Sequence, residues 1–221
     1  MRLLLVGYGK MGRMIEALAA EGRDEIVGRV DEGRDEWTAA DAAIDFSTAE
    51  ALVANFPQYV SRRLPVIIGT TGWAPHAERL RAEAARAGLG VVASANFSIG
   101  VNVFERVVAE AARLLANQPQ YGAWLHESHH RAKRDAPSGT AFLLRDAMVA
   151  AGYDREIDLS SARAGMIPGT HTVGFDSASD TIELTHRARD RRGFAGGALV
   201  AAHWIQGRTG WFSMQDVVGG A

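Results

Sequence analysis

Short apolar runs alternate with amphipathic segments over the first hundred residues of the chain. Runs of three to five residues with few polar interruptions are typical of strands buried on both faces of a parallel sheet. The predicted strands are residues 3–6, 26–30, 42–46, 65–68 and 91–93, and the helices predicted between them are residues 11–20, 48–59 and 75–87. This βαβ rhythm predicts an α/β fold with a Rossmann-type, doubly wound parallel sheet.

The pattern changes beyond residue 98. The apolar positions Ile99, Val103, Val107, Ala111 and Leu114 recur at helical spacing and predict an amphipathic helix over 99–115. Further strands are expected at 121–128, 160–166, 171–175 and 181–186, a helix from Pro137 to about Ala151, and a small-residue helix suited to close packing at 194–205. These elements predict a second α+β domain, with a mixed or antiparallel sheet covered by helices on one side.

A glycine motif follows the first strand and opens the first helix: Gly7, Tyr8, Gly9, Lys10, Met11 and Gly12. Its first glycine permits a tight turn, the second lets the backbone approach a pyrophosphate, and the third lets helix and strand pack closely. Asp31 ends the second strand nineteen positions beyond Gly12, where a carboxylate accepts hydrogen bonds from an adenosine ribose. A dinucleotide site is therefore predicted, the alternative being an aspartate in an ordinary polar turn.

Two later loops also lie at the carboxyl ends of predicted strands, where open α/β sheets bind ligands. The first contains Gly69, Thr70 and Thr71, and the second contains Ser94, Ala95, Asn96 and Phe97. Both are predicted cofactor contacts, with Phe97 packing on the cofactor. For the second loop an ordinary helix entry capped by Ser98 is an equal alternative.

The segment from Glu127 to Thr140 carries the richest chemistry. It holds the neighbouring imidazoles of His129 and His130, the ammonium of Lys133 and the helix start Ser138-Gly139-Thr140. Imidazoles exchange protons near neutral pH, and a helix start leaves backbone N–H groups free to face an anion. The segment is suited to binding and protonating a small dianion; the alternative is a solvated basic loop.

Composition narrows the choice of function. The chain has 221 residues, 47% hydrophobic content, a formal net charge of −2 and no cysteine. This balance gives no global basic field for nucleic acid or a membrane surface, and thiolate chemistry is excluded. The apolar run at the start is too short for a signal peptide, so we expect a cytoplasmic protein. Histidine spacing shows no metal-ligand motif, and no metal is expected.

Over nearly its whole length the chain resembles the dihydrodipicolinate reductase family, also called 4-hydroxy-tetrahydrodipicolinate reductase. The motifs that carry the resemblance are 7–13, Asp45-Phe46-Ser47, 69–72, 96–101, 127–140 and 194–198. The central block is specific to the family, whereas the glycine motif is shared with other dinucleotide-binding proteins.

The resemblance implies NADH- or NADPH-dependent reduction of a cyclic dicarboxylate in diaminopimelate and lysine biosynthesis. It implies that His129 donates or accepts the proton, that Lys133 assists, and that His130, Ser138, Gly139 and Thr140 hold a substrate carboxylate. It also implies a dinucleotide-binding domain of residues 1–97 and 195–221, and a substrate domain of residues 98–194 whose sheet assembles a homotetramer. The alternatives are another nicotinamide-dependent oxidoreductase of amino-acid metabolism, or a nucleotide-sensing protein without turnover.

Two departures from the family pattern concern the cofactor. The connection between Asp31 and Asp45 is shorter than usual, and only a brief charged link is expected there. Glu32 follows Asp31, so two negative charges are expected to repel a 2′-phosphate, while Lys10, Arg13 and Arg34 soften this repulsion. We expect NADH to be used at least as well as NADPH.

Overall fold

The computed structural model describes residues 1–219, apart from the side chain of Arg34. Gly220 and Ala221 lie outside the described residues. The Arg34 side chain, which was expected to soften the repulsion of a 2′-phosphate, is also outside them. The chain folds as two units, Met1–Ile99 with Arg192–Ala221, and Gly100–Arg191. Among the described helices none is both long and apolar enough to cross a membrane.

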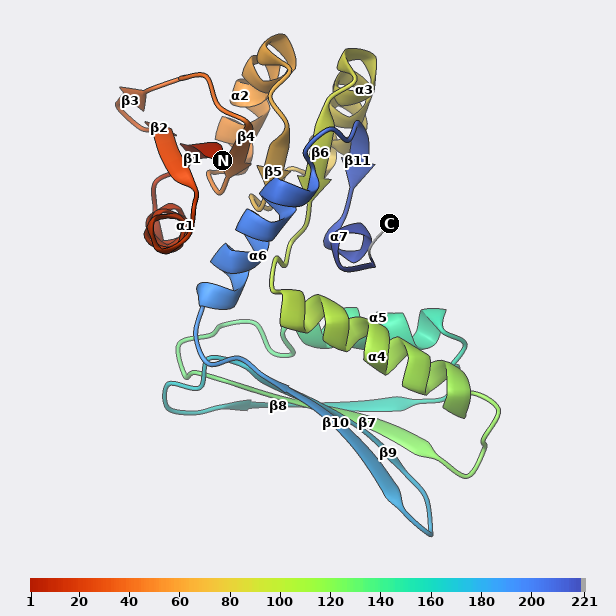
Figure 1. Cartoon of the computed structure of the whole chain (residues 1–221). Coiled ribbons are helices and arrows are strands. Elements are labelled where there is room, and N and C mark those ends of the chain that lie inside the picture. Colours follow the sequence, from red (N-terminus) through yellow and green to blue (C-terminus); the bar gives the residue numbers. More distant parts are fainter. Residues whose placement is uncertain (220–221) are drawn as a thin grey trace. The chain divides into compact units, whose positions relative to one another are not determined.

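The sheet of the first unit has the strand order β11-β6-β5-β4-β1-β2-β3 (Figure 1). All neighbours are parallel except β3, which runs antiparallel to β2. The strands are β1 Arg2–Val6, β2 Glu25–Asp31, β3 Arg34–Asp35, β4 Ala42–Asp45, β5 Val66–Ile68, β6 Gly90–Ala93 and β11 Gly210–Phe212. The predicted Rossmann-type class is confirmed, and β11 adds the C-terminal segment to the sheet edge.

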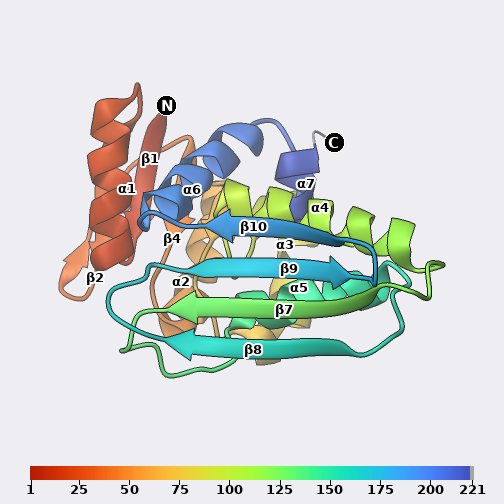
Figure 2. The same ribbon diagram turned by 90° about the horizontal axis from the view of Figure 1, so that it is seen from below.

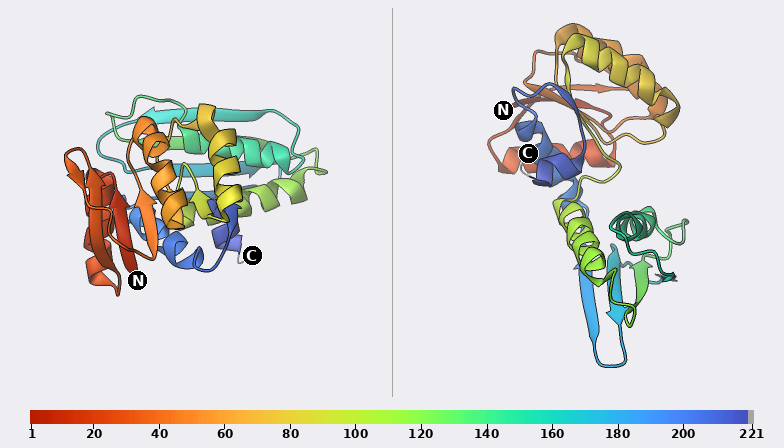
Figure 3. Two further views of the ribbon diagram at one scale, coloured as in Figure 1. Left: turned by 90° about the horizontal axis from the view of Figure 1, so that it is seen from above. Right: turned by 90° about the vertical axis from the view of Figure 1, so that its right-hand side faces the viewer.

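Helices cover both faces of this sheet (Figure 3, right). Leu3 and Leu5 of β1 point into a core with α1, α6 and α7, whereas Leu4 and Val6 point into a core with α2 and α3. This double burial explains the continuous apolar runs. The helices are α1 Lys10–Glu21, α2 Ala49–Arg62, the 3₁₀ turn η1 Ala74–His76, α3 Ala77–Ala87, α6 Arg192–Trp204 and α7 Met214–Gly219.

The short connection between Asp31 and Asp45 is more ordered than the sequence suggested. Gly33, with a φ of 73°, turns the chain so that β3 pairs back onto β2. Trp37 then packs against Tyr59 of α2, with ring centroids 5.6 Å apart. A hairpin anchored by an aromatic contact replaces the expected simple charged link.

The second unit contains a mixed sheet with the order β10-β9-β7-β8 (Figure 2). Its strands are β7 Gly122–His129, β8 Ile157–Arg163, β9 Thr170–Asp176 and β10 Thr181–Arg187, and α4 Ile99–Leu115 and α5 Gly139–Ala150 cover one face. The expected strand 160–166 was placed wrongly. β8 ends at Arg163 because the chain turns at Gly165, whose φ is 48°.

The exposed and buried faces of α4 also differ from expectation. The helix has the predicted bounds, but Ile99, Val103, Val107 and Leu114 are 38–60% exposed. Its buried face consists of Val101, Asn102, Phe104, Val108 and Ala112. The helix carries apolar side chains on two faces. Periodicity in the sequence indicated the face that is exposed in the structure, and the other face packs against the sheet.

Two adjacent glycines of α6 allow a matched test of close packing. A Cβ at Gly197 would lie 1.7 Å from the carbonyl oxygen of Phe97, whereas a Cβ at Gly196 would meet no atom within 4 Å. We expect Gly197→Ala to destabilise the protein by about 1–3 kcal/mol through overpacking. Gly196→Ala should stabilise it by up to about 1 kcal/mol through helix propensity. Urea unfolding checks both, and equal stabilities would contradict the close contact.

Candidate active site

The second unit gathers ionisable groups at the end of β7. Glu127 and His129 occupy alternate positions of the strand and therefore point to the same side, toward the helices. Glu127 is fully buried and His129 is 8% exposed. The Nδ1 atom of His129 makes a short hydrogen bond to a carboxylate oxygen of Glu127.

Glu127 receives further hydrogen bonds from two other elements. Arg163 at the end of β8 donates through Nη2 at 2.6 Å and through Nη1 at 3.0 Å, one to each oxygen. The backbone N–H of Ser138, at the start of α5, donates at 3.2 Å. Burial acts to raise the pKa of Glu127, but the hydrogen bonds from Arg163, Ser161 and His129 prevail and lower it to about 2.

The pKa of His129 is lowered from its ordinary value. Burial lowers its pKa, and the positive charges of Lys133 and Arg163 act in the same direction against the opposing effect of Glu127. Its Nε2 edge faces Gly169, where an added Cβ would lie 3.0 Å from Nε2. His171 of β9 packs edge-on against the ring, with centroids 5.1 Å apart.

His171 completes the cluster as a neutral residue. Burial and the neighbouring charge of His129 lower its pKa to about 4. The Ser138 hydroxyl accepts a hydrogen bond from the N–H of Ala141 and lies 3.1 Å from Nε2 of His171.

The other predicted substrate residues surround the start of α5. Ser138 caps the helix, while Gly139 is exposed and Thr140 and His130 are half-buried. Lys133 pairs with Asp135 at 2.8 Å, and Lys133 and the N–H of Gly139 both lower the pKa of Asp135. The ammonium of Lys133 is the largest influence on this carboxylate, and the backbone N–H at the start of the helix contributes less.

The side chains of Glu127, His129 and His171 lie within 4.8 Å of one another, a spacing that suits a cation. The histidine spacing in the sequence gave no sign of this cluster. However, both oxygens of Glu127 are engaged by the guanidinium of Arg163, whose fixed charge opposes a second cation. We therefore assign no metal to it.

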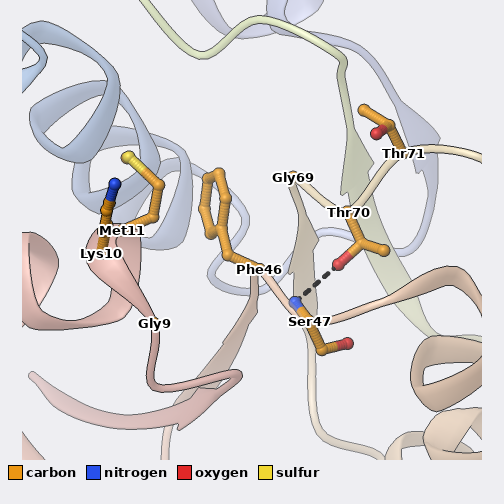
Figure 4. A pocket seen from close by; sticks show the side chains of 8 residues that line it. All are labelled: Gly9, Lys10, Met11, Phe46, Ser47, Gly69, Thr70 and Thr71. Carbon is orange, nitrogen blue, oxygen red and sulfur yellow. Dashed lines mark hydrogen bonds between the residues drawn. The ribbon is translucent and has the colours of Figure 1, made fainter.

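The glycine motif of the first unit has the geometry of a dinucleotide-binding loop. Gly7 has a φ of 85°, and a Cβ at Gly12 would lie 2.4 Å from the carbonyl oxygen of Gly7, so the turn and the close approach both require glycine. A Cβ at Gly9 meets no atom within 4 Å. Gly9 borders a cavity of about 340 Å³ whose other lining residues are Lys10, Met11, Phe46, Ser47, Gly69, Thr70 and Thr71 (Figure 4).

A second cavity of about 630 Å³ adjoins the first, because Ser47 lines both. Asp31 lies in its wall together with Glu32 and Asp35. Among its described lining residues there is no lysine or arginine. Lys10 lines the other cavity, and Arg13 lies over the ring of Tyr8 at 5.8 Å.

A buried carboxylate to which sequence reasoning assigned no role connects the loops of these cavities. Asp45, at the end of β4, is fully buried and accepts hydrogen bonds from Tyr59 (2.7 Å), Thr70 (2.7 Å) and both the backbone and the side chain of Ser47. Burial raises its pKa against these hydrogen bonds. The sequence signals were an acidic residue at the end of an otherwise apolar strand and its place in one of the motifs that carry the family resemblance.

Several predicted cofactor residues lie outside these two cavities. Tyr8 donates to Glu16, and Arg29 lies over its ring at 5.5 Å. Ser94 and Asn96 hydrogen-bond each other, and Asn96 accepts from the N–H of Ser98. The Phe97 ring is 1% exposed and packs edge-on against Phe46 in the core, so the backbone of Phe97, and not its ring, is the part available for the predicted cofactor contact.

The fold and the loops at the carboxyl ends of its strands define a two-unit α/β protein with a dinucleotide-binding sheet. Residues 1–97 match the model of the dihydrodipicolinate reductase N-terminus, and residues 100–218 match that of the C-terminus. The chain therefore belongs to the dihydrodipicolinate reductase family, and it is a nicotinamide-dependent oxidoreductase.

Named relatives agree with this family, and a solved structure shares the fold. A 4-hydroxy-tetrahydrodipicolinate reductase of Christiangramia forsetii is 34% identical, covering 99% of this chain and 98% of its own. One from Myxococcus xanthus is 41% identical, covering 81% and 72%. The fold matches that of a dipicolinate-bound dihydrodipicolinate reductase from Paenisporosarcina sp. TG-14 with a TM-score of 0.82 at 18% identity, over 96% of this chain and 97% of that one.

The open space at Gly9 gives a test of the cofactor loop that leaves the fold intact. Gly9→Ala should keep wild-type stability, because the new methyl group contacts no protein atom. It should weaken NADH binding at least tenfold, since the second glycine of the motif permits close backbone approach to the pyrophosphate. Calorimetric titration with NADH measures this, with Gly196→Ala as the control. An unchanged dissociation constant would remove Gly9 from the site.

Proposed function

We propose that the protein reduces 4-hydroxy-tetrahydrodipicolinate to tetrahydrodipicolinate with NADH or NADPH, in diaminopimelate and lysine biosynthesis. The observation that carries the proposal is the cluster at the end of β7, where an oriented, buried imidazole lies in the same unit as Lys133 and the start of α5. Relatives aligned over nearly the whole chain carry the name of this reductase. One protein of similar fold binds dipicolinate, a cyclic dicarboxylate.

Loss of the 4-hydroxyl group of the substrate as water gives a conjugated ring, and reduction of that ring requires a hydride at carbon and a proton at the enamine that results. The nicotinamide cofactor, when bound, supplies the hydride. His129 transfers the proton, and Lys133 stabilises the negative charge that develops. His130, Ser138, Gly139 and Thr140 hold a substrate carboxylate at the N-terminus of α5, whose free backbone N–H groups favour an anion.

The two domains of the chain have different functions in this reaction. Residues 1–97 and 195–221 bind the dinucleotide, with Gly7–Gly12, Asp31, Gly69–Thr71 and Ser94–Phe97 as its contacts. Residues 98–194 bind the substrate and form a homotetramer through the face of the four-stranded sheet that α4 and α5 leave uncovered. The absence of cysteine fits a reducing cytoplasm.

The oriented proton-transfer cluster also favours this function over nucleotide sensing. The buried carboxylate of Glu127 fixes the side chains of Arg163 and His129. A protein that only binds a nucleotide does not need an imidazole in a fixed orientation. Another nicotinamide-dependent oxidoreductase would share the glycine loop and Asp31, but it would not require the His129–Lys133 pair before the start of α5.

The decisive test is an assay in which a second enzyme produces the substrate. In an assay coupled to dihydrodipicolinate synthase, the protein should oxidise NADH or NADPH, measured by nicotinamide absorbance, only when the synthase product is present. His129→Gln should lower kcat on the order of 10²–10⁴-fold and leave NADH affinity unchanged, because it removes a placed proton donor.

His126→Gln, in the same strand but with its ring bonded to Ser160 and Ser128, is the matched control. No substrate-dependent absorbance loss with folded protein would refute the function. A loss in kcat below threefold would exclude His129 from the mechanism.

The acidic cavity predicts the cofactor preference. NADH should be used at least as well as NADPH, because Asp31, Glu32 and Asp35 repel a 2′-phosphate. Asp31→Ala should reduce kcat/KM for NADH and improve the relative use of NADPH. Asp146→Ala, an equal charge change in the other unit, should alter neither value. A wild-type preference for NADPH above tenfold would show that the carboxylates do not select the cofactor.

A further inference from the structure

Both edges of the His129 ring have defined surroundings. The Nδ1 edge is bonded to Glu127, whereas the Nε2 edge faces the bare backbone of Gly169. Within the described residues no side chain hydrogen-bonds Nε2. We propose that Glu127 and Arg163 form a positioning pair that keeps a hydrogen of His129 on Nδ1, so that Nε2 is the atom that takes up a proton from solvent and donates it to the substrate.

The assignment of the tautomer follows from the donors around Glu127. A carboxylate that is ionised only accepts hydrogen bonds, so the atom of His129 facing it must carry hydrogen. Arg163 donates to both oxygens, and a guanidinium beside a buried carboxylate strongly favours its charged form. Arg163 therefore acts on His129 through Glu127, without being placed at the substrate.

Glu127 also connects proton transfer with substrate anchoring. One of its oxygens accepts from Arg163 and from the N–H of Ser138, and the other accepts from Arg163 and His129. Ser138 is the N-cap of α5, whose first turn is the proposed carboxylate site. A single carboxylate thus holds the imidazole of β7 and the helix start of α5 in one fixed relation.

Gly169 completes the arrangement. Its φ of 151° lies in a region that side chains rarely adopt, and a methyl group there would press on Nε2 at 3.0 Å. Its backbone is anchored by accepting a hydrogen bond from the N–H of Ala188 at 2.9 Å. The residue keeps the reactive edge of the imidazole free of protein side chains.

The Glu127→Gln variant replaces the carboxylate by an uncharged amide of the same shape and therefore tests the effect of the carboxylate on the tautomer of His129. The amide has one oxygen, and Arg163 offers only donors, so the oxygen should turn to Arg163 and the NH₂ group to Nδ1 of His129. The hydrogen of His129 is then forced onto Nε2. Replacement of an orienting carboxylate by its amide costs on the order of 10⁴ in kcat where it reverses the histidine tautomer in this way.

The first experiment needs no substrate and so does not depend on the proposed function. Long-range ¹H–¹⁵N NMR of the free protein, above the histidine pKa, should show His129 with hydrogen on Nδ1 in the wild type and on Nε2 in Glu127→Gln. Glu110→Gln, which alters an exposed glutamate paired with Arg113, should leave the His129 signals unchanged. Hydrogen on Nε2 in the wild type would overturn the inference, even if the variant failed to fold.

The second experiment, in the coupled assay, rests on the proposed function. Glu127→Gln should lower kcat 10²–10⁴-fold while the affinity for NADH stays within threefold. Adding Arg163→Met frees the amide oxygen to accept from Nδ1, so the double variant should regain at least tenfold in kcat and the wild-type tautomer.

If Glu127 and Arg163 were important only for the stability of the protein, the double variant would be less stable than Glu127→Gln, and its kcat would not recover. An inactive wild type with the expected tautomers would refute the function and keep the positioning pair. An active wild type whose Glu127→Gln variant stays within threefold would refute the positioning pair alone.

Discussion

The ion pair between Glu127 and Arg163 is the interaction on which the candidate active site depends. A fully buried carboxylate is costly unless it is paired and hydrogen-bonded, and Glu127 has both kinds of compensation. Because its partners come from β7, β8 and the start of α5, satisfying this one charge requires all three elements to meet. The side chains proposed for proton transfer and anchoring are placed by that requirement.

The first unit also contains a buried carboxylate, but the hydrogen-bond partners of that carboxylate carry no positive charge. Asp45 is equally buried, but its partners are the hydroxyl groups of Tyr59, Thr70 and Ser47 together with a backbone N–H. Burial consequently raises the pKa of Asp45, whereas the arginine lowers that of Glu127. Asp45 serves to join the loops after β4 and β5, and Glu127 serves to keep a fixed charge beside an imidazole.

The cavities of the first unit depend on glycine for different reasons. Gly7 and Gly12 are required by the protein itself, through a positive φ and a close backbone approach. Gly9 meets no such requirement, so its lack of a side chain benefits only a ligand. The neighbouring acidic wall of Asp31, Glu32 and Asp35 then gives the site its electrostatic character.

Local signals in the sequence were sufficient for the class of fold. Apolar runs identified the parallel strands β1, β2, β4, β5 and β6 but not β11, the glycine motif identified the turn after β1, and Ser138 identified the start of α5. Each depends on residues within about one helical turn or one strand, whose spacing reports directly on backbone geometry. The residues proposed for chemistry, His129 and Lys133, were found in the same way because they lie in one short segment.

Only the tertiary structure decided which distant residues meet. Arg163 lies 36 positions from Glu127, and nothing in its own neighbourhood distinguishes it from a solvated arginine. The buried stripe of α4, the core position of Phe97 and the hairpin of β3 likewise depend on partners elsewhere in the chain. Periodicity shows that a side chain has a preferred face, but packing and the pairing of buried charge select the partner, and both are properties of the assembled chain.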